Sequence, residues 1–562
     1  MLSRVLATTF LAGACLAQNN DSRMDQIVQS YVPKQFMGSV LVARGNDVLL
    51  NKGYGSANLE WDIANSPLTK FRLGSVTKQF TAASVLLLEE RGKLKIDDPV
   101  KKYMPDAPAA WDKMTIFHVL THTAGIPNFT GFADYQSTEA LPATPEKLVT
   151  RFRDKPLEFE PGEKWNYSNS GYVLLGYLIE KISGETYEKF LQENIFGPLG
   201  MKDSGYDSNS AVIPRRAAGY APGPNGPVNA GFINMTVPFS AGALYSTTGD
   251  LLKWEQGLFA GKVLSAASLA KMTTPFKNDY AFGLGVHTVK GHKAIDHNGG
   301  IEGFNTILAY YPEDKLTVVV LGNLNGAAPE DIATKLAAIA HGEAVKLQSE
   351  REQISIDPAV LAREVGAYQL APGVTMLVTL DGNQLMTKLG NQQRVPIFPE
   401  SQTMFFAKVV DAQIEFAKPD AQGIPGQLIL HQNGRDQTAN RLSDAEFKQI
   451  AAAADASDKR FKDQTAAPGS EAAVRRIIEE LRTGKPNYDL MGAGLAAATR
   501  QQLPQLQTLV SGLGAVQQVS FKGVGPGGAD IYEIRFANGA LEYRLSMGAD
   551  GKVEGANVRP VQ

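Results

Sequence analysis

Residues 24–345 carry strand-like apolar runs at both ends and helix-like spacing between them. Residues 39–44 and 48–53 predict two strands near the start, and residues 305–311 and 316–321 predict two more near the end. Strands at both ends of a domain, with helices between them, predict an α+β fold. We expect one antiparallel sheet closed by both ends of the domain, with an inserted helical region.

The pattern changes after a polar, charged segment at residues 343–357. Short alternating strands separated by turns then predict a small all-β domain at residues 358–445. A helical stretch followed by a hairpin of alternating apolar and charged residues predicts a small α+β domain at residues 470–562. Within the first domain, residues 221–234 are rich in Gly and Pro and predict a loop.

Residues 1–17 predict a secretory signal that is not part of the fold. Arg4 precedes an apolar run at residues 5–11, and small residues follow it. The letters Leu-Ala-Gly-Ala-Cys ending at Cys15 loosely resemble a bacterial lipoprotein signal, whose cysteine is acylated and anchors the protein to lipid. Ala12 stands where that motif usually has leucine, so simple export to the periplasm or the extracellular space is favoured. Beyond residue 17, no apolar run of about 18 residues predicts a membrane span.

Length and composition narrow the classes of function that this chain can have. A chain of 562 residues is too long for one core and predicts about two to four domains. The net charge is −3 without long runs of one sign, so nothing favours nucleic acid as a partner. Cys15 is the only cysteine, so the mature chain has no disulfide. We expect a small-molecule or peptide substrate and no cofactor, and the sequence carries no signal for an oligomeric state.

Ser75 and Lys78 lie three residues apart at the start of a predicted helix, so they share one face. A serine hydroxyl becomes a good nucleophile only when a base takes its proton. A desolvated lysine one turn away can be neutral and act as that base. The alternative is an N-cap serine followed by a surface lysine, which is common for so short a motif.

Two later clusters add polar groups that can transfer protons or bind a substrate. Tyr167 and Asn169 are one residue apart, so in an extended segment both side chains can enter one cleft. A phenol near an ammonium can have a lowered pKa and can shuttle a proton, and the amide of Asn169 can hold a substrate carbonyl or amide. The alternative is a turn beside a buried aromatic residue.

The second cluster, His297-Asn-Gly-Gly, directly precedes a predicted strand. Glycines at a strand edge allow a substrate backbone to approach closely. A main-chain N–H there, together with that of Ser75, can form an oxyanion hole, and His297 can add a positive or hydrogen-bonding group at the rim. The alternative is a glycine-rich β-turn.

In this order, Ser75-Val-Thr-Lys78, Tyr167-Ser-Asn169 and His297-Asn-Gly299 resemble the three motifs of the serine β-lactamase and penicillin-binding-protein superfamily. The branch resembled contains class C β-lactamases, D-alanyl-D-alanine carboxypeptidases, D-aminopeptidases and related esterases. The stretches 120–126, 242–251 and 282–285 are also similar to this branch. The resemblance covers about residues 24–345.

The resemblance implies a role for each motif residue. Ser75 is the acylated nucleophile, and Lys78 and Tyr167 share the general acid and base work. The expected oxyanion hole is formed by the backbone N–H groups of Ser75 and Gly300. The residues expected to bind substrate are Asn169, His297, Asn298 and Gly299.

One departure bears on the substrate. Typical β-lactamases have Lys-Thr-Gly where this chain has His297-Asn298-Gly299, and their lysine and threonine help to bind the β-lactam carboxylate. Histidine is mostly neutral at pH 7, and asparagine lacks the hydroxyl. We therefore expect an exported serine hydrolase acting on a D-amino-acid peptide or a small ester. The alternatives are a β-lactamase and a penicillin-binding or sensor protein that does not turn over.

Two further motifs are set aside. His118 and His122 have a spacing that binds zinc in some helices, but no glutamate completes the pattern, so structural or capping roles are favoured and no metal site is predicted. The glycines at residues 523–528 precede a strand rather than a helix and predict a loop instead of a phosphate site.

The domain at 358–445 resembles a β domain often appended to this family, and residues 470–562 distantly resemble nuclear transport factor. Both can cover the active site, contact another protein or the cell wall, dimerise, or only pack on the hydrolase.

Overall fold

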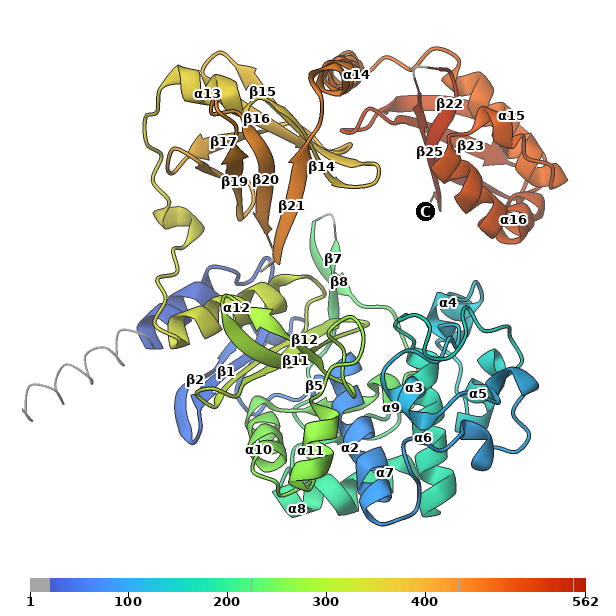
Figure 1. The fold of residues 1–562 in the computed structure, drawn as a ribbon. Coiled ribbons are helices and arrows are strands. Elements are labelled where there is room, and N and C mark those ends of the chain that lie inside the picture. Colours follow the sequence, from blue (N-terminus) through green and yellow to red (C-terminus); the bar gives the residue numbers. More distant parts are fainter. Residues whose placement is uncertain (1–20, 224, 433–434, 549, 562) are drawn as a thin grey trace, which may run out of the picture. The chain divides into compact units, whose positions relative to one another are not determined.

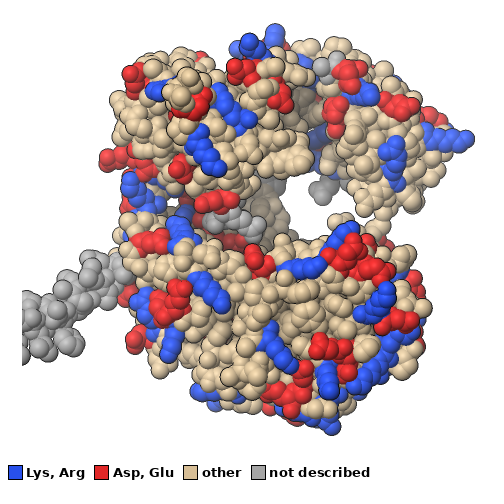
Figure 2. All heavy atoms as spheres, in the orientation of Figure 1, with Lys and Arg blue, Asp and Glu red and all other residues tan. Residues whose placement is uncertain are grey.

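The computed structural model describes residues 21–223, 225–432, 435–548 and 550–561, and the chain divides into two compact units (Figure 1). The first unit ends at Leu347 and the second begins at Gln348. The predicted signal at residues 1–17, including Cys15, lies outside the described residues. Basic and acidic side chains are interspersed on the face drawn in Figure 2. No helix within the described ranges combines the length and the apolar character that a membrane crossing requires.

A six-stranded antiparallel sheet forms the frame of the first unit, in the order β10-β11-β12-β13-β1-β2. The strand β1 pairs with the edge strand β2 on one side and with β13 on the other, with Gly38 opposite Gly322. The predicted sheet built from both ends of the domain is therefore confirmed. Its strands are β1 (Gly38–Arg44), β2 (Asp47–Tyr54), β10 (Gly285–Val289), β11 (His292–Ile301), β12 (Phe304–Tyr311) and β13 (Leu316–Gly322).

Both faces of this sheet are covered. Val40 and Val42 of β1 pack in one apolar cluster with Ile332 of α12 (Ala328–Ala340). Leu41 and Ala43 face the other way, into the larger cluster formed with the inserted helices. Because alternate residues of β1 are buried on opposite faces, the strand is a continuous apolar run rather than an alternating one.

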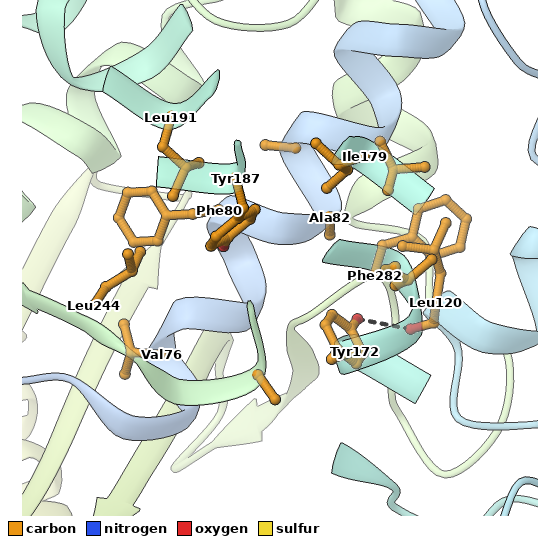
Figure 3. Packing of buried hydrophobic residues seen from close by; sticks show 14 of the residues in the cluster. Val76, Phe80, Ala82, Leu120, Tyr172, Ile179, Tyr187, Leu191, Leu244 and Phe282 are labelled. Atoms are coloured by element: carbon orange, nitrogen blue, oxygen red, sulfur yellow. Dashed lines mark hydrogen bonds between the residues drawn. The ribbon is translucent and has the colours of Figure 1, made fainter. Parts of the chain in front are cut away.

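The helix that follows Ser75, α2 (Thr77–Glu90), is at the centre of the inserted region and is buried over most of its length. Phe80 of α2 stacks on Trp254 of α10 (Thr248–Phe259) with ring centroids 4.2 Å apart. Figure 3 shows Phe80, Tyr187, Leu191 and Leu244 gathered on one side of this core. The other helices of the unit are α3 (Ile116–Leu120), α4 (Tyr135–Thr138), α5 (Pro145–Arg153), α6 (Asn169–Ser183), α7 (Tyr187–Leu191), α8 (Gly197–Leu199), α9 (Phe239–Gly242) and α11 (Ala266–Met272).

The predicted loop at residues 221–234 contains a short hairpin instead, formed by β7 (Tyr220–Gly223) and β8 (Gly226–Asn229). Pro222 pairs with Pro227 across it. Proline lacks the N–H that a central strand needs, but in a two-stranded hairpin each strand is an edge. The prolines that indicated a loop are therefore compatible with this hairpin.

The second unit contains a closed eight-stranded antiparallel barrel, in agreement with the predicted all-β architecture. Its strands are β14 (Gly366–Ala371), β15 (Val374–Asp381), β16 (Gln384–Leu389), β17 (Val395–Pro399), β18 (Met404–Ala407), β19 (Ala412–Pro419), β20 (Pro425–Gln432) and β21 (Arg435–Arg441). The helix α14 (Asp444–Asp463) follows, started by a capping box between Ser443 and Glu446.

The last part of the second unit is an α+β structure, as predicted. A four-stranded sheet, β22 (Val516–Val524), β23 (Asp530–Phe536), β24 (Gly539–Met547) and β25 (Val553–Pro560), packs against α15 (Ser470–Thr483) and α16 (Ala493–Leu513). The sequence indicated the helix α15 and the β23–β24 hairpin. It did not indicate α16, which contains Pro504.

Candidate active site

Ser75 lies in a short 3-10 turn at residues Gly74–Val76, immediately before α2. Gly74 has φ +53°, a conformation that side chains disfavour, and a Cβ built there would lie 2.9 Å from the nitrogen of Gly300. The preceding residue, Leu73, accepts a hydrogen bond from Thr306 Oγ1 at 2.8 Å. This turn therefore holds Ser75 directly against the sheet, and Ser75 caps no helix with its side chain.

Lys78 is completely buried, one helical turn after Ser75. Its Nζ lies 2.9 Å from Ser75 Oγ, 2.9 Å from Asn169 Oδ1 and 2.9 Å from the carbonyl oxygen of Ala241. Burial lowers the pKa of Lys78 well below its usual range. In its neutral form the amine can donate its two protons to Asn169 Oδ1 and the Ala241 carbonyl oxygen. Its lone pair is then available to accept the Ser75 proton. The alternative of a surface lysine does not describe this side chain.

Tyr167 lies close enough to Ser75 for the two side chains to interact. Its ring centroid lies 4.9 Å from Lys78 Nζ. Burial raises the pKa of the Tyr167 phenol, and the interaction with Ser75 offsets only part of that effect. The sequence suggested a pKa lowered by a neighbouring ammonium. The direction differs because desolvation dominates and because the same burial favours the uncharged form of Lys78.

His122, for which the sequence favoured a structural or capping role, supports the Tyr167–Asn169 segment. Its ring lies 4.4 Å from the Tyr167 ring, and its Nδ1 accepts a hydrogen bond from the Ser168 N–H at 3.2 Å. Burial and the nearby Lys78 lower the pKa of His122 well below its usual range. His118 instead completes a capping box with Thr115 at the start of α3. The favoured structural and capping roles describe both histidines.

Asn169 is the first residue of α6 rather than part of an extended segment. Its backbone N–H donates to Asn128 Oδ1 at 3.1 Å, and its side-chain amide donates to Thr130 Oγ1 at 3.2 Å. With its oxygen facing Lys78, the amide has a fixed orientation. Nothing in the sequence indicated Asn128 or Thr130, since neither belongs to a recognised motif; they lie at the short 3-10 helix Phe129–Gly131.

The predicted oxyanion-hole residues, Ser75 and Gly300, line one pocket. Gly300 lies near the end of β11, beyond Asp296, where the pairing of β10 with β11 stops. The neighbouring Gly299 is packed so tightly that a Cβ would lie 2.0 Å from the Leu73 carbonyl oxygen. The two glycines therefore allow the Ser75 turn and the β11 edge to meet, as a close backbone approach requires.

His297 lies on β11 but is buried and does not form part of an exposed rim. Its Nε2 is 3.0 Å from the Tyr280 hydroxyl, and its Nδ1 is 2.6 Å from the Asn298 carbonyl oxygen. A carbonyl oxygen only accepts, so Nδ1 carries the proton and Nε2 accepts from Tyr280. Burial lowers the pKa of His297 to about 3, so the ring is neutral. Of the two groups that the sequence allowed at this position, positive or hydrogen-bonding, the neutral ring is not the positive one.

Asn298 is on the opposite side of the strand from His297. Its side-chain amide donates to Glu330 Oε1 of α12 at 2.5 Å. The structure therefore brings together Ser75, Lys78, Tyr167, Asn169, Gly299 and Gly300 but turns the Asn298 side chain away from them.

The pocket beside Ser75 has a volume of about 230 Å³. Among its described lining residues, Glu302 is the only one with a charged side chain. In the described part of the chain, no group of three or more His, Cys, Asp or Glu residues is arranged to hold a metal ion. The lining residues are Gly74, Ser75, Phe129, Thr130, Tyr135, Asn169, Ile233, Pro238, Ala241, Gly242, Gly300, Ile301 and Glu302.

Residues 24–342 match the family model described as Beta-lactamase, and residues 350–448 match a domain of unknown function, DUF3471. A penicillin-binding protein of Bacillus subtilis (strain 168) is 30% identical over 457 residues, which cover 76% of this chain and 100% of the relative.

Two solved structures are similar in fold. The octameric penicillin-binding protein homologue from Pyrococcus abyssi has a TM-score of 0.54 and 26% identity, covering 75% of this chain and 99% of that chain. The D-amino acid amidase from Ochrobactrum anthropi SV3, complexed with L-phenylalanine, has a TM-score of 0.51, 23% identity and coverage of 58% and 98%. At that identity the second likeness concerns the fold alone.

Proposed function

Because this chain belongs to the beta-lactamase family and is a serine hydrolase of that fold, we propose that it works through a covalent acyl-enzyme on Ser75. The substrate is a D-amino-acid peptide or a small ester. The observation that carries the proposal is the 2.9 Å contact between Lys78 Nζ and Ser75 Oγ, made by a lysine whose pKa is lowered by burial.

Acylation needs a base, a stabilised oxyanion and an acid. Neutral Lys78 takes the Ser75 proton while the serine oxygen forms a bond to the substrate carbonyl carbon. The carbonyl oxygen gains negative charge and is held by the N–H groups of Ser75 and Gly300. As the bond to the leaving group breaks, Tyr167 donates a proton to that group and the Lys78 ammonium replaces it. Asn169 holds the substrate carbonyl or amide.

Deacylation uses the same groups in reverse. A water attacks the acyl carbon and gives its proton to the Lys78–Tyr167 pair. Ser75 then leaves as an alcohol with a proton from that pair, and the acid product departs. Tyr167 suits this work as a neutral phenol, because its raised pKa keeps the proton in place until the leaving group needs it.

The site favours peptides and esters over β-lactams. A β-lactam carries a carboxylate, which family members with Lys-Thr-Gly bind through the lysine and threonine. Here the neutral ring of His297 is occupied by Tyr280 and the Asn298 carbonyl oxygen, and the Asn298 amide is occupied by Glu330. Neither side chain is free to meet a carboxylate.

The proposal extends to the rest of the chain. Residues 1–17 act as an export signal, with lipid attachment at Cys15 as the alternative. The hydrolase domain spans residues 24–345, and the two appended domains span residues 358–445 and 470–562.

The test is hydrolysis of a short-chain p-nitrophenyl ester by the mature protein and by Ser75→Ala. A matched control is Ser210→Ala, which removes an exposed loop serine. The proposal expects activity in the wild type and the control, and loss of activity in Ser75→Ala. Equal activity in all three proteins would contradict the assignment of the nucleophile.

A further inference from the structure

Glu302 is the one residue with a charged side chain among the described residues that line the pocket beside Ser75. It lies in the turn between β11 and β12, two residues after Gly300. Asn169 lines the same pocket. No lysine, arginine or histidine is among the described residues that line this pocket. A substrate in it therefore meets negative charge without a matching cation.

The Glu302 carboxylate is incompletely satisfied. Its Oε2 is shielded from solvent and has no hydrogen-bond partner within the described ranges. A shielded carboxylate oxygen without a donor is costly, and each such group in a native structure requires an explanation. A positively charged ligand in the pocket would offset this cost through its charge, without having to contact the shielded oxygen itself.

The side chains near Glu302 do not supply that charge. Glu302 raises the pKa of Glu139 and contributes to the raised pKa of Tyr135, after the larger effect of burial in both cases. The nearby cation Arg151 is already paired with Asp134 at 2.8 Å. This end of the pocket therefore has excess negative charge.

We propose that Glu302 binds the protonated amine of the substrate, so that the enzyme prefers amides, esters and peptides with a free α-ammonium group next to the scissile carbonyl. This inference rests on the proposed role of Ser75. The α-ammonium is attached to the carbon adjacent to the carbonyl that Ser75 attacks, so both groups enter the same pocket. A substrate whose only charge is a carboxylate meets Glu302 with repulsion.

The test compares two anilides that differ only in the amine. D-alanine p-nitroanilide carries the ammonium, and N-acetyl-D-alanine p-nitroanilide does not. The wild type is expected to favour the first in kcat/KM by about tenfold to a hundredfold, the range of a charge-assisted hydrogen bond. Glu302→Gln is expected to lose most of this preference, mainly through KM. In Glu302→Lys, the preference for the free amine is expected to fall further, and the variant is expected to favour N-succinyl-D-alanine p-nitroanilide.

Glu139→Gln is the matched control, since it removes a neighbouring carboxylate that does not line the pocket. It is expected to keep most of the preference. An unchanged preference in Glu302→Gln, or equal losses in both variants, would overturn the inference, and thermal melts check that each variant is folded.

Ester hydrolysis separates this inference from the proposal on which it rests. If Ser75→Ala abolishes p-nitrophenyl ester hydrolysis but Glu302→Gln leaves the amine preference unchanged, only the role of Glu302 fails. If ester hydrolysis does not depend on Ser75, the proposed function itself fails.

Discussion

Gly74 and Gly300 are packed so closely that a Cβ on Gly74 would lie 2.9 Å from the Gly300 nitrogen. This contact joins the turn that carries Ser75 to the strand edge that carries Gly300, the second proposed oxyanion donor. The proposed nucleophile and the proposed oxyanion hole therefore depend on one backbone-to-backbone approach, which leaves no room for a side chain.

Gly74→Ala is expected to lower ester kcat/KM more than tenfold. The new methyl group must push β11 away from Ser75, in addition to the cost of about 1–2 kcal/mol for a left-handed non-glycine residue. Steady-state kinetics and a thermal melt measure the two effects. Gly45→Ala is the control, since Gly45 has φ +58° but open space around it. Equal activity losses in both variants would show that backbone strain, and not the contact, is responsible.

Lys78→Met should reduce ester hydrolysis by about 10²–10⁴-fold, the usual contribution of a general base. In the wild type, activity should rise with pH as Lys78 loses its proton. Because burial lowers the pKa of Lys78, this rise should be complete well below the ordinary lysine range. A pH–rate profile checks the prediction. A rise centred near the ordinary value for lysine would mean that the amine is not desolvated during catalysis.

Tyr167→Phe keeps the ring on His122 but removes the proton donor. An anilide leaving group must be protonated, whereas p-nitrophenolate leaves without a proton. The variant should therefore lose activity toward an anilide by about 10²-fold or more and lose less toward a p-nitrophenyl ester. The ratio of the two kcat/KM values measures this, and equal losses would argue against an acid role for Tyr167.

Tyr280→Phe leaves Nε2 of the buried His297 without its donor. An unsatisfied buried acceptor costs about 1–3 kcal/mol, so the melting temperature of the first unit should fall by several degrees. Tyr177→Phe, on the partly exposed side of α6, is the comparison and should have a smaller effect. No difference between the two melts would mean that water replaces the Tyr280 hydroxyl.

The sheet and the position of Ser75 beside Lys78 could both be predicted from the sequence. A three-residue spacing on a helix fixes a shared face whatever surrounds it. The sheet could be predicted because the runs at both ends of the domain are continuously apolar. Helix spacing depends only on local geometry, and the burial of a strand can be inferred from its apolar residues.

The protonation states and the orientations of the site side chains could not be predicted in the same way. His297 and Tyr167 are buried by segments distant in sequence, and this burial shifts their pKa values. Burial also lowers the pKa of Lys78, so Tyr167 faces a neutral amine and not an ammonium. Asn298 was assigned to the substrate because it lies within a motif, yet strand alternation turns it toward Glu330. The helix α16 was missed because Pro504 interrupts its pattern.

The pairing of β1 with β13 has a consequence for the order of events during synthesis. Ser75 leaves the ribosome early, but the sheet cannot close until Gly322 has been made, because Gly38 pairs with it. Gly300, which reaches Ser75 through β11, also comes late in translation. A nascent chain therefore carries the proposed nucleophile without its proposed oxyanion partner, so we expect hydrolytic activity to appear only after nearly the whole first unit has been released.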